Sequence, residues 1–138
     1  MPVFMDVKKF PVPEHQADAI FSQVNPISGT KYLMLDITKN CRVIGIDISC
    51  VWTVQPSPLE IYITIDSVNY TASKVDPVSA AYYVVYAVPT STGLSLIVGA
   101  DAIKERAFLL EGRSIKIEAA ITGGTVSSLF GRVKYAKW

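Results

Sequence analysis

Few residues in this chain have the types and spacing that catalysis needs. The one histidine, His15, stands in a proline-rich segment near the start of the chain. Nucleophilic catalysis needs a base beside a nucleophile and a third group that orients the base. If Cys41 and Cys50 share an extended strand, they lie about 30 Å apart, whereas a disulfide needs Cα atoms within about 7 Å. We therefore expect free, buried thiols and no zinc site, since zinc needs several converging ligands.

Paired carboxylates are the remaining route to catalysis, as in glycoside hydrolysis. The candidate pairs are Glu60 with Asp66, and Asp47 across the sheet from Glu60. Each of these side chains falls on a strand face predicted to meet solvent, where a carboxylate is usually only solvated. Gly123-Gly124 lacks the lysine and the following helix that phosphate-binding loops use. The sequence therefore predicts that the protein is not an enzyme and binds no cofactor or metal.

Composition favours one folded domain with apolar surface to cover. The chain has 138 residues, of which 50% are hydrophobic and 18% charged, and its mean hydropathy is +0.32. A membrane-spanning helix needs about 20 apolar residues in a row, and the longest apolar stretch, Ala80 to Val88, is much shorter. The net charge of +1 gives no case for nucleic-acid binding. We expect neither a membrane nor a nucleic acid as partner, and we expect subunit contacts in a homo-oligomer.

Apolar residues alternate with polar residues along most of the chain, which is the pattern of half-buried β-strands. Ile44, Ile46 and Ile48 share one predicted face of a long strand, and Val43 and Asp47 share the other. The predicted strands are Tyr32–Ile37, Arg42–Val54, Leu59–Asp66, Asn69–Val75, Ala81–Val88, Leu94–Val98, Ala107–Leu110, Ser114–Thr122 and Thr125–Lys137. Ala81–Val88 is apolar on both faces, so we expect it to be covered on both sides.

Turn residues separate these strands at short, regular intervals. Gln55–Pro58 links two strong strands, Gly123-Gly124 reads as a two-residue hairpin, and Asp101–Arg106 could form one helical turn. The predicted fold is an all-β antiparallel sandwich, like a jelly roll, with about eight strands. Prolines interrupt the first residues, so we assign residues 1–30 to an irregular N-terminal arm and residues 31–138 to the sandwich domain.

The aromatic side chains are the candidates for contact with a partner. They could stack on sugars, but most such rings fill cores and interfaces. Trp138, as the last residue, is expected to dock somewhere, either on its own domain or across a subunit boundary. The candidate subunit-interface residues are Phe4, Phe10, Phe21, Tyr82, Tyr83, Tyr86 and Trp138.

The second half of the chain resembles the ending of small β-sandwich virion proteins from tailed phages and related viruses. The resemblance is carried by FLLEGRSIKIEA at 108–119, GGTV at 123–126 and GRVKY at 131–135, and it extends over about 100 residues from Thr30 onward. It implies a capsid, decoration or tail subunit that is located in the virion and assembles as a trimer or pentamer with other virion proteins. A carbohydrate- or receptor-binding module, with a glycan as ligand, is the alternative.

Overall fold

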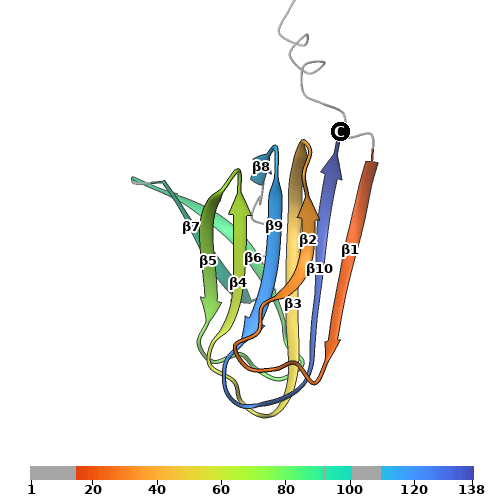
Figure 1. Cartoon of the computed structure of the whole chain (residues 1–138). Helices are drawn as coiled ribbons and strands as arrows, with labels where there is room; N and C mark the ends of the chain where they lie inside the picture. Colours follow the sequence, from red (N-terminus) through yellow and green to blue (C-terminus); the bar gives the residue numbers. More distant parts are fainter. Residues whose placement is uncertain (1–14, 92, 101–109) are drawn as a thin grey trace, which may run out of the picture.

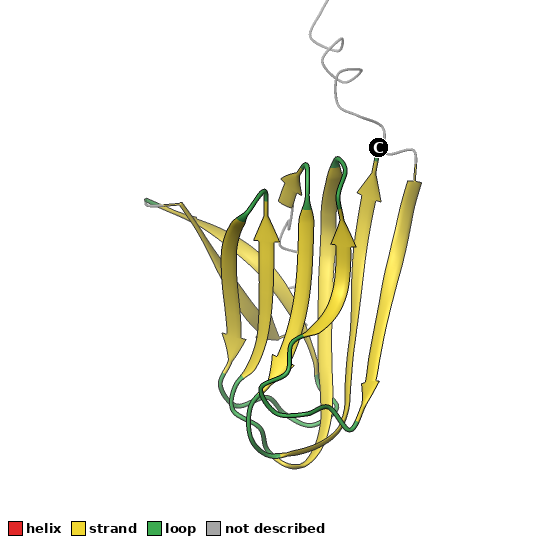
Figure 2. Ribbon diagram, viewed as in Figure 1, coloured by secondary structure: helices red, strands yellow, loops and turns green. Residues whose placement is uncertain are grey.

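The chain forms two antiparallel β-sheets packed face to face (Figures 1 and 2). The computed structural model describes residues 15–91, 93–100 and 110–138, and all regular elements in these ranges are strands. The strands are β1 (His15–Val24), β2 (Tyr32–Ile37), β3 (Cys41–Val54), β4 (Leu59–Ile65), β5 (Val68–Lys74), β6 (Tyr82–Thr90), β7 (Gly93–Ala100), β8 (Leu110–Gly112), β9 (Ile115–Ile121) and β10 (Thr125–Lys137).

The strand order is that of a jelly roll, which confirms the predicted fold class. One sheet runs β1-β10-β3-β6-β7, with β8 also on β3, and the other runs β2-β9-β4-β5. The first part of the chain therefore pairs with the second in reverse order: β1 with β10, β2 with β9, β3 with β8, and β4 with β5. A ribbon of strands wound in this way gives two nested Greek keys. The β6–β7 hairpin is an addition to this pattern and extends the six-stranded sheet.

The core lies between the sheets and follows the predicted alternation in most strands. In β4, Leu59, Ile61 and Ile63 are fully buried, while the side chains between them face outward. In β9, Ile115 and Ile117 are fully buried in the same way. Since β4 and β9 are neighbours at the centre of the four-stranded sheet, their inward side chains form one continuous apolar layer.

A β-bulge in β3 departs from the predicted alternation. Lys134 of β10 pairs with Gly45, but the next residue, Tyr135, pairs with Val43, so Ile44 has no partner on β10. An unpaired residue of this kind reverses which side chains point inward. Val43 is therefore fully buried. Ile44 was predicted to lie on the core face, and instead it lies on the outer side of the sheet.

Part of the segment predicted as an irregular arm is a regular strand. Residues His15–Val24 form β1 and pair with β10 along their whole length. The prolines of this segment flank the strand and do not interrupt it, so the ladder is unbroken. Residues 1–14 and 101–109 lie outside the described residues. The predicted helical turn at 101–106 and most of the predicted strand at 107–110 fall there.

The predicted hairpin at Gly123-Gly124 is wrong, because this turn connects the two sheets. It joins β9 of the four-stranded sheet to β10 of the six-stranded sheet. Both glycines have positive φ, at 70° and 71°. A Cβ on Gly124 would lie 2.5 Å from the Val54 carbonyl oxygen and 2.7 Å from the Pro56 nitrogen, whereas a Cβ on Gly123 would meet nothing within 4 Å.

These two glycines make a matched pair for testing the crossover. Gly123→Ala should lower the free energy of unfolding by about 1–2 kcal/mol, the cost of a left-handed backbone for alanine. Gly124→Ala should lower it by about 3 kcal/mol or more, because its Cβ also collides with backbone that cannot move aside. Urea denaturation of the two variants measures both values. Equal losses would show that the close approach at Gly124 is not there.

Candidate functional site

The predicted interface tyrosines Tyr82 and Tyr83 point to opposite sides of β6. Tyr82 is 55% exposed on the outer face of the six-stranded sheet. Tyr83 is buried in the core, and its hydroxyl oxygen accepts a hydrogen bond of 2.8 Å from the Val78 backbone N–H. Since adjacent strand residues alternate between faces, only one of the two can reach a partner. Tyr83 therefore stabilises its own subunit, which corrects its assignment as an interface residue.

The other predicted interface rings have contacts within the chain. Phe21 packs against the core, and its ring centroid lies 6.1 Å from that of Tyr32. Tyr86 is also partly buried against the core. The ring of Trp138 has the Arg42 guanidinium 5.6 Å from its centroid. The terminal tryptophan therefore docks on its own domain. Phe4 and Phe10 lie outside the described residues.

Around Tyr82, three neighbouring strands form a hollow on the outer face of the six-stranded sheet. Tyr82 meets Phe130 of β10 edge-on, with ring centroids 6.3 Å apart. Beside them, Arg132 of β10 donates to the Asp47 carboxylate of β3 over 2.8 Å. This hydrogen bond and the charge of Asp47 raise the pKa of Arg132. These four side chains, two aromatic rings and one ion pair, line a hollow of about 340 Å³.

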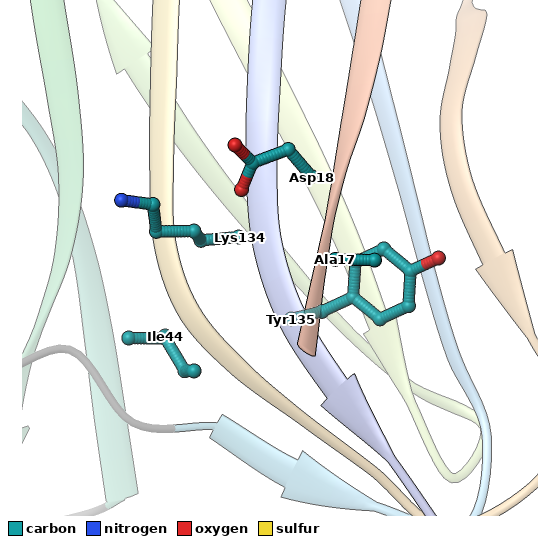
Figure 3. A pocket seen from close by; sticks show the side chains of 5 residues that line it. All are labelled: Ala17, Asp18, Ile44, Lys134 and Tyr135. Carbon is teal, nitrogen blue, oxygen red and sulfur yellow. The ribbon is translucent and has the colours of Figure 1, made fainter. Parts of the chain in front are cut away.

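A second hollow lies further along β10, where β3 has its bulge (Figure 3). It has a volume of about 460 Å³ and is lined by Ala17, Asp18, Ile44, Lys134 and Tyr135. Figure 3 shows the Lys134 and Asp18 side chains extending to one side of the strands and the Tyr135 ring to the other.

Exposed and half-buried apolar side chains lie on the same face of the sheet as the hollow at Tyr82. We call this surface the outer A face, and define it by Ile20, Val24, Val51, Tyr82 and Phe130, which lie on β1, β3, β6 and β10. Ile20 is 69% exposed and Val24 66%. One line of paired residues crosses these four strands and includes both rings: Ser22, Phe130, Ser49 and Tyr82. The outer A face is thus a mixed apolar patch with one central ion pair.

The outer face of the four-stranded sheet is more polar. Here a hollow of about 360 Å³ is lined by Lys31, Tyr62, Thr64, Asn69, Tyr70, Thr71, Lys116 and Glu118. The Tyr62 hydroxyl donates to the Glu60 carboxylate over 2.6 Å, and this bond, with burial and the Glu60 charge, raises the pKa of Tyr62 to about 12. The Lys31 ammonium lies 4.2 Å from the centroid of the Tyr62 ring. A ligand that stacks on the face of Tyr62 next to Lys31 must therefore displace that ammonium group.

The predicted carboxylate pairs are not brought together. Asp47 belongs to the six-stranded sheet and Glu60 to the four-stranded sheet. Asp66 stands at the end of β4 and accepts hydrogen bonds of 2.8 and 3.0 Å from the backbone N–H groups of Arg113 and Ser114. Within residues 15–91, 93–100 and 110–138, no three His, Cys, Asp or Glu side chains could hold a metal ion together. The same residues contain no helix long and apolar enough to cross a membrane.

Both cysteines are buried and unbridged, as the sequence predicted. Cys41 begins β3, and Cys50 lies further along the same strand with its side chain in the core. Burial raises the pKa of the Cys50 thiol to about 11. Burial also raises the pKa of Cys41, although the positive charge of Lys137 opposes the change. The thiolate is the nucleophile in cysteine chemistry, so burial disfavours the reactive form of both side chains.

Comparison with protein-family models, with curated proteins and with solved structures found no match for this chain. The two outer faces are therefore judged on their own chemistry.

Sequence reasoning missed Asp47, Phe130 and Arg132 as neighbours of Tyr82. These residues lie close together only because β10 pairs with β3 in the register that sets Arg132 opposite Asp47. No local pattern in the sequence specifies that register.

Ionisation of the buried Cys50 thiol is expected to destabilise the fold at alkaline pH. In the unfolded chain it ionises near its ordinary value of 9.0, but in the folded chain only near 11. Its contribution is complete below pH 9 and is lost as the pH rises from 9 to 11, on the order of 2 kcal/mol. Urea denaturation at several pH values measures this loss, and Cys50→Ala should show a shallower decline. Equal declines in both proteins would contradict the assignment.

Proposed function

We propose that the protein is a virion structural subunit, a capsid, decoration or tail component that acts through subunit–subunit assembly. The observation that carries the proposal is the jelly-roll strand order, in which β1, β2, β3 and β4 pair with β10, β9, β8 and β5. Viral capsid proteins and lectins are two large groups that use this architecture. Because a fold alone does not specify a function, the choice between these two rests on the surfaces.

The outer A face supports assembly. It exposes Ile20, Val24 and Tyr82 in one sheet surface, and exposed apolar patches of this kind typically mark protein–protein contacts. The Arg132–Asp47 pair would give such a contact polar specificity at small cost, since its charges are already matched. The resemblance of residues 108–135 to virion sandwich proteins agrees with this choice. We infer a cyclic trimer or pentamer that meets other virion proteins.

Light scattering coupled to size-exclusion chromatography tests the assembly. The full chain should form a trimer or pentamer, and Tyr82→Ser should shift it toward monomer, because the most exposed ring of the outer A face is lost. Tyr62→Ser, on the opposite outer face, is the matched control and should leave the oligomer unchanged. A wild-type monomer at every concentration up to the millimolar range would refute the proposal. Mass spectrometry of purified virus particles should then detect the chain.

A carbohydrate- or receptor-binding module is the second candidate, favoured by the hollow on the four-stranded sheet. Tyr62, Asn69 and Glu118 there combine an aromatic ring with amide and carboxylate groups, the set that orients sugar hydroxyls. The Lys31 ammonium over the Tyr62 ring weighs against it, since a sugar must compete with that contact.

A glycan array separates the two candidates. Binding that is lost in Tyr62→Ala and kept in Tyr82→Ala would assign a sugar to the four-stranded face, because only the first variant removes the ring of that hollow. Tyr62→Phe keeps the ring and loses the hydrogen bond to Glu60, so it should retain most of the affinity. An array that stays blank at millimolar ligand removes this candidate.

A further inference from the structure

The outer edge of β1 has no strand beside it among the residues that the structure describes. β1 stands at the end of the six-stranded sheet, next to β10 alone (Figure 1). Its ten residues pair with β10 without a register shift, so the free edge is long and regular. Such an edge presents unpaired N–H and C=O groups that can pair with another strand.

The hydrogen-bond pattern shows which residues of β1 face this edge. The Asn25 N–H donates to the Ser127 carbonyl over 2.9 Å, and these residues continue the β1–β10 ladder. In an antiparallel pair, the residues that exchange hydrogen bonds alternate with residues whose backbone groups point away. Residues 16, 18, 20, 22 and 24 therefore direct their N–H and C=O groups to the free edge.

β1 carries fewer features that discourage pairing than β2 and β5 do, and its one acidic residue is Asp18. β2 has a register shift between Leu33 and Leu35, which distorts its ladder. β5 ends in Lys74, and it lies against β7, so the two close one side of the sandwich together. β1 has no lysine, proline or bulge. These are the devices with which proteins blunt exposed edges.

We propose that β1 pairs antiparallel with β1 of a second copy of this chain, about a two-fold axis at Ile20. The inference rests on the proposed function of assembly and identifies one of its contacts. In this register Ile20 stands opposite the partner's Ile20, and Asp18 stands opposite the partner's Ser22. All five edge-facing residues of each strand find a partner, which gives about ten hydrogen bonds between the chains. The two six-stranded sheets become one.

The pattern of side chains selects this register. The only acidic residue of β1 is Asp18, and an axis at Asp18 would set two carboxylates directly opposite each other, which is unfavourable. An axis at Ser22 would leave Asp18 without a pairing residue on the partner strand. With the axis at Ile20, two side chains that are each 69% exposed cover one another. On the inner side, Ala19 stands opposite the partner's Phe21, a small residue beside a large one.

A two-fold contact at β1 would use the Ile20 end of the outer A face and leave the Tyr82 end for a cyclic contact. Tyr82 lies on β6, with β3 and β10 between it and β1. A ring of three or five subunits could therefore use the region of Tyr82 and still present β1 at its rim. Two-fold contacts between rims would join rings to one another.

Disulfide trapping tests the inference at single-residue resolution. Ile20→Cys should give a covalent dimer in mild oxidant, because opposed residues in this register have Cα atoms about 5.5 Å apart, within the range of a disulfide. Cys41 and Cys50 are buried and do not compete. Non-reducing electrophoresis of the full chain measures the product, and circular dichroism checks that the variant is folded.

Two controls make the result specific for the register. Val24→Cys alone should stay monomeric in the gel, since the two introduced thiols would lie about 26 Å apart along the strands. Asp18→Cys mixed with Ser22→Cys should form a heterodimer, whereas either variant alone should not, because its own copies are about 13 Å apart. Ile20→Lys should abolish trapping of the Asp18→Cys and Ser22→Cys mixture when added to both chains, by opposing two ammonium groups.

The outcomes separate this contact from the proposed function. A self-associating protein in which Ile20→Cys gives no dimer overturns the β1 contact and leaves the assembly role standing; a β1 edge covered by residues 1–14 would give this result. Trapping at Ile20 with no ring larger than a dimer supports the β1 contact and overturns the trimer or pentamer. A strict monomer that cannot be trapped ends both.

Discussion

The pairing of β10 with β3 is the constraint on which the rest of the structure depends. These are the two longest strands, with 13 and 14 residues, and they lie side by side in the six-stranded sheet. A slip of one residue between them would move the inward side chains of one strand to the outer face. The ion pair of the outer A face depends directly on this register, because it sets Arg132 opposite Asp47, and the contact of Phe130 with Tyr82 depends on it in part.

The same strand also packs closely against the other sheet. At Gly131 the backbone of β10 runs so near its neighbours that a Cβ would collide with the end of the Met34 side chain on β2 and lie 3.1 Å from the Asp47 carbonyl oxygen. Glycine at this position lets the four-stranded sheet pack against β10 without a gap. Because β1 is aligned only on β10, the position of its free edge is set by the same strand.

The alternation of apolar and polar residues along the sequence predicted most strands, because it directly reflects the burial of one strand face. The bounds of Tyr32–Ile37 and Thr125–Lys137 agree with β2 and β10, and the alternation in β4 and β9 was confirmed. The failures have one physical origin, since they depend on which strands become neighbours. Gly123-Gly124 has the chemistry of a tight turn, but a tight turn can join two sheets as well as two strands of one hairpin. The bulge at Ile44 likewise exists only in relation to β10.

The candidate surfaces show the same division between local and non-local information. That Tyr82 or Tyr83 must be buried follows from strand geometry, but which one is buried depends on the register of β6 on β3, where Tyr83 stands opposite Ile48. The two outer faces then differ in chemistry: one carries exposed isoleucine, valine and tyrosine, and the other threonine, asparagine, lysine and glutamate around Tyr62. A subunit in a shell needs this asymmetry, because one surface must be covered by its neighbours while the other stays compatible with water. The same sheet contains the free edge of β1, so in the proposed assembly a single sheet would present both a face and an edge to other copies. This coincidence within one sheet is the strongest physical argument for assembly over ligand binding.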